Sequence, residues 1–380
     1  MNLDLSPEQE LIRDTVRAFA QEKVAPVAEE LDREHRFPYE LVAEMAELGL
    51  MGIPIPEAYG GGGGDTLSYA LAIEELTRVD SSVAITVAAH TSLGTMPIYL
   101  FGTEEQKQEW LPDLATGRKL AAFGLTEPGA GSDAGSARTT AELRDGRWVV
   151  DGAKMFITNA GTDITACVTI TALTGEGEVS NIVVPNGTPG YEISAPMQKL
   201  GWRASDTREL SFQGCAVPEG NLLGPRGAGF KQFLEILDGG RISVASMGVG
   251  LAQGAYDLAY AYSLERQQFG RPIASFQAVQ FQLADLATEI EAGRSLVHRA
   301  AWLKDEGRPF ALAAAQAKLY TGLLSNRAAN IALQIHGGYG FMDEYAISRL
   351  YRDQKILEIG EGTNEVQRMV IAKHLGLPAS

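Results

Sequence analysis

Residues 351–367 read YRDQKILEIGEGTNEVQ, and the rest of the chain is best interpreted from this stretch. An apolar run at helical spacing is interrupted by Gly360-Glu361-Gly362, and a second helical run follows Thr363. Because glycine has no Cβ, a ligand can approach the backbone on both sides of Glu361. Thr363 suits the N-cap position, so the next helix would direct free N–H groups toward an anion such as a pyrophosphate. The stretch predicts a carboxylate base beside an anion site, with a surface Glu between two helices as the alternative.

Length and composition limit the number of domains and the classes of ligand that the chain can bind. The chain has 380 residues, enough for two or three domains with cores of their own. A hydrophobic content of 45% and a charged content of 21% are typical of a soluble globular protein. The net charge of -16 argues against nucleic acid or an anionic membrane surface as a partner. An anionic ligand such as coenzyme A would therefore need Arg or Lys side chains at its own site.

The sequence shows no metal, disulfide or targeting pattern. Cys167 and Cys215 lack metal-ligand or C-x-x-C spacing, so we expect reduced core residues. The five histidines contain no H-x-x-x-H or H-x-H pair, which predicts no metal site. The N-terminus has no basic region followed by an apolar core, and we expect no apolar run of the roughly 18 residues that span a membrane. A cytoplasmic protein is the expectation.

The spacing of the apolar residues changes twice along the chain and predicts three domains. Capping boxes at Ser6 and Thr103 and apolar residues at helical spacing predict a helical domain over residues 1–118. Short apolar runs between Gly-containing turns predict an antiparallel barrel or sandwich over 119–231, rather than a Rossmann fold. Long helical patterns return over 232–380 and predict a four-helix bundle. The expected strands are 120–125, 148–150, 164–171, 182–184 and 210–212, and the expected long helices are 233–266, 276–305, 310–335 and 348–359.

Other segments carry chemistry only in combination. The loop FGLTEPGAGSD, residues 123–133, has glycines that can turn backbone N–H groups toward an anion, although a plain structural loop fits equally well. Phe156 in Phe156-Ile157-Thr158 reads by itself as a core residue of a strand. The run of glycines at 60–64 lacks the strand and the Lys-Ser/Thr of a phosphate loop, so it is expected to connect helices.

Taken together, these segments resemble the acyl-CoA dehydrogenase family. The resemblance includes TEPGAGSD, a Phe-Ile-Thr in place of the usual W-I-T, DGGR at 238–241, RQQFG at 266–270, QIHGG at 334–338 and the EGT of the opening stretch. It covers essentially the whole chain in the family's order. It implies an α+β multidomain fold with an N-terminal helical domain, a central antiparallel β domain and a C-terminal four-helix bundle.

The resemblance also implies which residues bind FAD and acyl-CoA. The residues assigned to FAD are Phe123, Leu125, Thr126, Gly131, Ser132, Phe156, Ile157, Thr158, Arg266, Phe269, Phe276, Gln277, Gln334, Ile335, Gly337, Gly338, Thr363 and Glu365. The segments around Arg266 and Phe276 are expected to reach the FAD of a neighbouring subunit in a homotetramer. The residues assigned to the acyl-CoA are Ser132, Asp238, Arg241 and Gly362.

The implied reaction converts an acyl-CoA thioester into the trans-2-enoyl-CoA and passes electrons to an electron-transfer flavoprotein. Glu361 would remove the α-proton, and enclosure should raise its pKa. One branch of the family supplies this Glu from the position of Gly240, so that second base is absent here. The linear-chain enzymes usually have Tyr before the base; Gly360 predicts either a wider pocket that accepts branched acyl groups or a gap refilled by another side chain.

Alternatives remain at this point. An acyl-CoA oxidase would share the first half of the reaction but is usually a longer chain, and a silent acyl-CoA-binding scaffold would not need Glu361. Nitroalkane oxidases use Asp as the base. Acyl chain length, the electron acceptor and the pathway, whether fatty-acid β-oxidation or amino-acid degradation, stay open.

Overall fold

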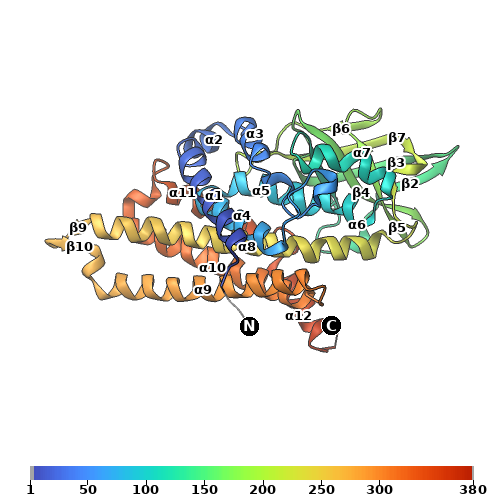
Figure 1. Cartoon of the computed structure of the whole chain (residues 1–380). Helices are drawn as coiled ribbons and strands as arrows, with labels where there is room; N and C mark the ends of the chain where they lie inside the picture. Colours follow the sequence, from blue (N-terminus) through green and yellow to red (C-terminus); the bar gives the residue numbers. More distant parts are fainter. Residues whose placement is uncertain (1–3, 379–380) are drawn as a thin grey trace.

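Three structural parts follow one another along the chain in the computed structural model, which describes residues 4–378. Figure 1 shows a set of short helices, a twisted sheet at one end of the molecule, and long helices that run away from the sheet. Residues 1–3 and 379–380, which the predicted domain ranges include, lie outside the described part. The predicted fold class is confirmed.

The first part is helical, as predicted. Both capping boxes are present: Ser6 Oγ accepts the N–H of Gln9 at 3.2 Å, and Thr103 Oγ1 accepts the N–H of Gln106 at 3.3 Å. These bonds satisfy backbone donors that have no partner inside the helix, which explains why the helices begin there. The helices are α1 Pro7–Phe19, α2 Ala28–Glu34, α3 Tyr39–Glu47, α4 Thr66–Val79, α5 Ser81–Ala89, α6 Met96–Phe101 and α7 Glu104–Ala115.

One eight-stranded sheet forms the second part. Its strands are β1 Leu120–Gly124, β2 Thr140–Arg144, β3 Arg147–Thr158, β4 Thr165–Gly175, β5 Glu178–Pro185, β6 Tyr191–Ile193, β7 Thr207–Pro218 and β8 Leu222–Leu223. Most neighbouring strands are antiparallel, as predicted, but β1 pairs with β4 in parallel and β2 meets β4 in parallel at one residue pair. Strand β1 enters directly from the helical part, so no hairpin fixes its direction. The sheet is therefore mixed.

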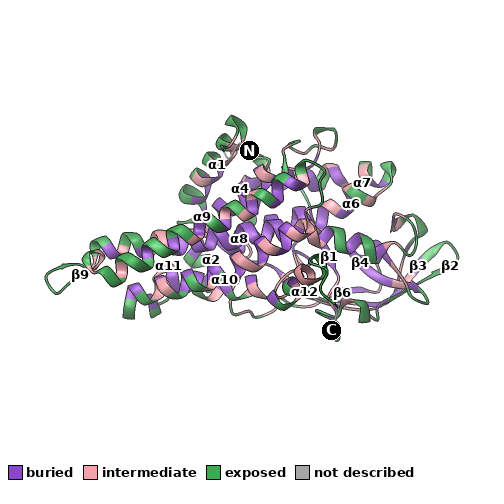
Figure 2. Cartoon of the chain, turned by 90° about the horizontal axis from the view of Figure 1, so that it is seen from below, coloured by how far each residue is buried: buried purple, intermediate pink, exposed green. Residues whose placement is uncertain are grey.

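Long helices form the third part, and Figure 2 shows buried faces along α8 and α10. The helices are α8 Gly229–Glu265, α9 Gln277–Asp305, α10 Ala311–His336, α11 Ala346–Asp353 and α12 Asn364–His374. The prediction of one helix over 348–359 is wrong in part, because α11 ends at Asp353 and a 3₁₀ segment, η9 (Gln354–Glu358), follows. The buried carboxylate of Asp353 accepts hydrogen bonds from Ser81 Oγ and the Trp202 N–H, which fixes that end.

Close helix packing explains the glycines inside α8. A Cβ at Gly248 would lie 2.7 Å from Thr321 of α10, and a Cβ at Gly250 would lie 2.3 Å from the carbonyl oxygen of Glu74 in α4. Both distances are shorter than real contacts, so glycine is needed at these positions. Helix α8 thus connects the first and third parts of the molecule.

The expectation about membrane-length runs is wrong in one respect. Residues 81–101 are long and apolar enough to cross a membrane by length and composition. However, 83% of the 18-residue stretch within it that meets this criterion is buried inside the protein, as in a core helix. Cys167 and Cys215 are both buried and free, as predicted.

Candidate active site

A cleft of about 920 Å³ lies where the three parts of the chain meet. This volume is within the range of small-molecule sites. Of the predicted site residues, the cleft brings together Phe123, Leu125, Thr126, Gly131, Ser132, Phe156, Ile157, Thr158, Arg241, Glu361, Gly362 and Thr363. Segments more than 200 residues apart in the sequence therefore share one cavity.

Glu361 enters the cleft from a tight turn between η9 and α12. Its φ is 51° and that of Gly362 is 91°, so two consecutive residues have left-handed backbone conformations. A residue with a Cβ rarely adopts this conformation, and its occurrence at a cleft is typical of a functional position. The turn ends at Thr363, whose side chain accepts the Val366 N–H at 3.3 Å and caps α12 as predicted.

The carboxylate of Glu361 has an unusual environment. Its Oε2 atom is buried and has no hydrogen-bond partner within the described chain. Burial raises the pKa of Glu361 to about 7, although the nearby charges of Arg241 and Lys318 act in the opposite direction. A carboxylate that titrates near neutral pH is suited to remove a proton from a weak carbon acid.

Helix α8 approaches this carboxylate through a glycine. A Cβ at Gly240 would lie 2.1 Å from Glu361 Oε2, so no other residue fits without moving the carboxylate. The next residue, Arg241, is buried and pairs with Asp238 at 2.5 Å. Asp238 does not line the cleft itself and acts on it through Arg241.

A buried ion pair anchors the loop 123–133. Glu127 accepts hydrogen bonds from the backbone N–H groups of Arg138 at 2.6 Å and Thr139 at 3.0 Å, and it contacts Lys154 Nζ at 2.8 Å. Lys154 is fully buried in strand β3. The Gly-rich loop is thus attached through Glu127 to strand β3 and to the backbone just before β2.

Comparison with known proteins identifies the chain. Residues 6–118, 122–215 and 227–376 match the models of the acyl-CoA dehydrogenase N-terminal, middle and C-terminal domains. The chain belongs to the acyl-CoA dehydrogenase family. It is 52% identical to the probable acyl-CoA dehydrogenase YngJ of Bacillus subtilis, over 99% of this chain and 100% of that protein.

Two further relatives agree with this result. The short-chain specific acyl-CoA dehydrogenase of Clostridium acetobutylicum is 45% identical over 98% of this chain and 99% of its own. The solved structure of butyryl-CoA dehydrogenase from Megasphaera elsdenii superposes with a TM-score of 0.96 at 43% identity, over 99% of this chain and 100% of the other. Membership of the family confirms the predicted oxidoreductase class and the predicted FAD cofactor.

The cleft of this acyl-CoA dehydrogenase fits a planar cofactor. Phe156 is 65% exposed on the cleft wall with a φ of 63°, so it is not the core residue that its strand position suggests in isolation. Trp202, which also lines the cleft, has a positive φ as well. Aromatic surface exposed on a cleft wall is a feature that a bound flavin ring would cover.

A second group of predicted FAD residues lies away from the cleft. Figure 1 shows β9 and β10 at the end of the long helices opposite the sheet. Here Arg266 stacks over Tyr339, and Phe269, 92% exposed, meets Phe276 with ring centroids 6.0 Å apart. The predicted FAD residues outside the cleft are Arg266, Phe269, Phe276, Gln277, Gln334, Ile335, Gly337 and Gly338, together with Glu365 on the exposed side of α12.

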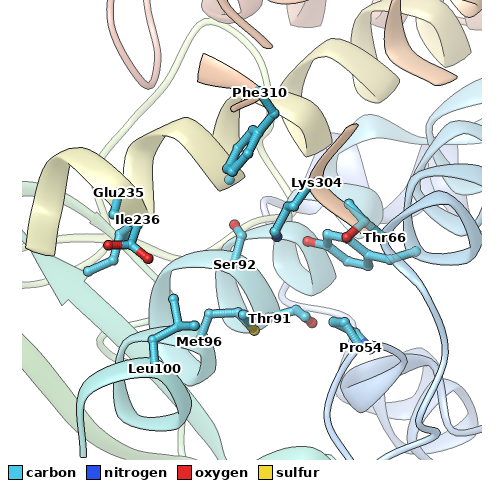
Figure 3. Close-up of a pocket in the computed structure, with 12 residues that line it drawn as sticks. Pro54, Thr66, Thr91, Ser92, Met96, Leu100, Glu235, Ile236, Lys304 and Phe310 are labelled. Atoms are coloured by element: carbon cyan, nitrogen blue, oxygen red, sulfur yellow. The ribbon is translucent and has the colours of Figure 1, made fainter. Parts of the chain in front are cut away.

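The segment after Ser82 contributes to two separate cavities, and the sequence left its packing open. Ile85, Ala89 and Leu93 line the large cleft, whereas Thr91 and Ser92 line a second cavity of about 190 Å³. Figure 3 shows Ser92 and Lys304 directed into this smaller cavity. The two cavities share no lining residue.

The sequence did not single out several residues around the site. The segment 197–202, including Lys199, lines the cleft. Lys318 of α10 is fully buried next to the turn that holds Glu361. The available signal for Lys318 was a single charged residue directly after the alanine-rich run 311–317. Among the described residues no group of three His, Cys, Asp or Glu side chains is placed to hold a metal.

Proposed function

We propose that this acyl-CoA dehydrogenase oxidises a short, medium or branched acyl-CoA to the trans-2-enoyl-CoA, with Glu361 as the base. The observation that carries the proposal is Glu361 itself, which lines the large cleft, has one buried and unpartnered carboxylate oxygen within the described chain, and has a pKa of about 7. Such a group is a stronger base than a solvated carboxylate and is still ionised in part at neutral pH.

Glu361 supplies two groups to the reaction. Its side chain removes the α-proton of the thioester. Its backbone N–H donates no hydrogen bond within the described chain, so it is available to donate to the thioester oxygen, where negative charge develops as the proton leaves. When bound, FAD supplies the acceptor for the two electrons and the hydrogen lost from Cβ. Phe123, Leu125, Thr126, Ser132 and 156–158 would hold the flavin in the cleft.

The acyl end of the cleft supports an apolar substrate. Ile85, Ala89 and Leu93 present only hydrocarbon to it. A terminal carboxylate placed there would lose its hydration without gaining a partner, which costs several kcal/mol. The short-chain specificity named for the Clostridium acetobutylicum relative agrees with a short apolar acyl group.

The space beside Gly360 supports acceptance of branched acyl groups. Gly360 lines the cleft, and a Cβ built there would have, apart from its two chain neighbours, only atoms of Ile356 within 4 Å among residues 4–378. We expect turnover of isovaleryl-CoA by the wild-type enzyme and its selective loss in Gly360→Tyr, with butyryl-CoA turnover retained. Equal discrimination between the two substrates by both proteins would remove this part of the proposal.

The base is tested with Glu361→Gln. This variant should retain bound yellow flavin but show no bleaching of the flavin absorbance when butyryl-CoA is added without oxygen. Bleaching at the wild-type rate would place the base elsewhere. Release of peroxide during wild-type turnover, without reduction of an added electron-transfer flavoprotein, would favour an oxidase.

An electron-transfer flavoprotein is the proposed electron acceptor. A structure described as the electron transferring flavoprotein of Acidaminococcus fermentans contains a chain that matches this one with a TM-score of 0.97 and 45% identity, over 99% of both chains. A structure from Bacillus anthracis, described as a complex with FAD, matches with a TM-score of 0.93 and 38% identity, over 98% of this chain and 67% of the other. We expect the enzyme to act in the cytoplasm.

A homotetramer would give the second group of FAD residues a role. The exposed aromatic Phe269 and its neighbour Arg266 flank β9 (Gln267–Gln268), which Figure 1 shows at the end of the long helices opposite the sheet, and neither residue lines the cleft. A second copy of the chain could bring them to the adenine end of its flavin. Light scattering should give four times the monomer mass, and Arg266→Ala should release flavin.

A further inference from the structure

Lys318 is a buried cation at the site that the proposed chemistry has not used. It lies in α10 with 0% of its surface exposed, among the largest fully buried side chains of the molecule. Its Nζ donates to the carbonyl oxygen of Gly362 at 2.7 Å. Burial lowers the pKa of Lys318 to about 8, while the negative charge of Glu361 opposes that change. A buried ammonium group is costly, so its retention needs a compensating interaction.

Lys318 shares the task of holding the turn with Gln367. The Nε2 of Gln367, also fully buried, donates to the Gly362 carbonyl at 2.9 Å and to the Glu361 carbonyl at 3.3 Å. The left-handed conformation of Glu361 costs about 1–3 kcal/mol and persists only where the surroundings fix it. These two side chains therefore hold the carbonyls that follow the catalytic carboxylate, one with a charge and one without.

The other titratable groups near the pair come from four elements. Arg241 and Asp238 project from α8, the neutral Tyr69 from α4, Glu358 from η9 and Glu365 from α12. Arg241 forms an ion pair with Asp238 and has the larger of the two cationic effects on Glu361. Lys318 has the next largest, and it forms no ion pair within 4.0 Å among the described residues.

We propose that Lys318 is a positioning residue for the base: its ammonium group fixes the Gly362 carbonyl, and its charge favours the ionised form of Glu361. The proposal rests on Glu361 being the base. Lys318 is not among the residues that line the cleft, so it is assigned a positioning role and not a catalytic one. The effect of Lys318 on the position of the turn and its effect on the charge of Glu361 can be measured separately, because Gln367 holds the same Gly362 carbonyl without carrying a charge.

The test compares three variants of the flavin-loaded enzyme with butyryl-CoA. Lys318→Gln keeps a hydrogen-bond donor but removes the charge, and we expect the acidic limb of kcat/KM to move up by about one pH unit. Gln367→Met removes the uncharged donor, and we expect the plateau of kcat to fall by about tenfold without movement of the limb. Lys373→Gln, at the exposed end of α12, controls for the loss of one positive charge and should match the wild type.

The outcomes separate the role of Lys318 from the assignment of Glu361 as the base. An unmoved limb in Lys318→Gln, with Glu361→Gln inactive, refutes the role of Lys318 and leaves the base assignment intact. Activity in Glu361→Gln refutes the base assignment first. Flavin absorbance and circular dichroism report whether Lys318→Gln folds. If it does not, Lys318→Arg, which keeps both the charge and a donor, should leave the limb where it is in the wild type, and a limb that moves up by about one pH unit in that variant would overturn the role of the charge.

Discussion

Glu361→Gln should make the protein more stable at alkaline pH while removing its activity. The pKa of Glu361 is raised from 4.5 to about 7 by burial, so the folded protein binds this proton more tightly than the unfolded chain does. Stability contributed by the protonated form is present below pH 4.5 and is lost as the pH rises through 7. At 1.36 kcal/mol per pKa unit, a shift of about 2.5 units destabilises the wild type by up to ~3 kcal/mol above pH 7.

The assay is urea unfolding of wild type and variant from pH 5 to 8.5, followed by circular dichroism. The stability difference should be small at pH 5 and grow toward ~3 kcal/mol at pH 8. Glu40→Gln is the control, because Glu40 is exposed and its pKa is lowered by a backbone hydrogen bond and by Arg36, which gives a pH trend of opposite sign. A difference between wild type and Glu361→Gln that stays constant with pH would refute the buried-carboxylate argument.

Four further variants follow from the packing. Gly240→Ala should lower kcat at least a hundredfold, because its Cβ would displace the Glu361 carboxylate. Gly239→Ala is the control: a Cβ there would lie 3.4 Å from its nearest neighbour, so this variant should keep its activity and stabilise α8 by up to ~1 kcal/mol. Steady-state kinetics and thermal unfolding check both variants. Glu127→Gln should cost about 3 kcal/mol by leaving Lys154 buried without its partner, and should lower the flavin-to-protein absorbance ratio after dialysis. Asp353→Ala should lower the unfolding free energy by about 2 kcal/mol, measured in urea, because two buried donors lose their acceptor.

The parts of the site that a contiguous stretch encodes were predictable from the sequence. The glycines around Glu361, the N-cap at Thr363 and the loop 123–133 each depend on neighbouring residues, and the structure places all of them at one cleft. The helix starts at the capping boxes were predictable for the same reason, since the bonds join residues three apart.

The rest depends on contacts between distant residues. Lys318 reads as an ordinary helical lysine, and its importance comes from a carbonyl 44 residues away. The parallel pairing of β1 with β4 depends on how the sheet is assembled. The pattern of apolar and polar residues within one strand does not determine the direction of the strand beside it. The run 81–101 is as apolar as a membrane helix because it is covered by the protein itself, and composition does not distinguish the two environments.

The contact between Gly240 and Glu361 also restricts how such an enzyme can change over generations. Two places in the chain, one on a long helix and one in a short turn, compete for a single point in space. A side chain at Gly240 would displace the Glu361 carboxylate from the position that it now occupies. Transfer of the acid from one segment to the other in single steps therefore passes through a chain with a displaced carboxylate, and descent tends to preserve whichever arrangement a lineage inherited.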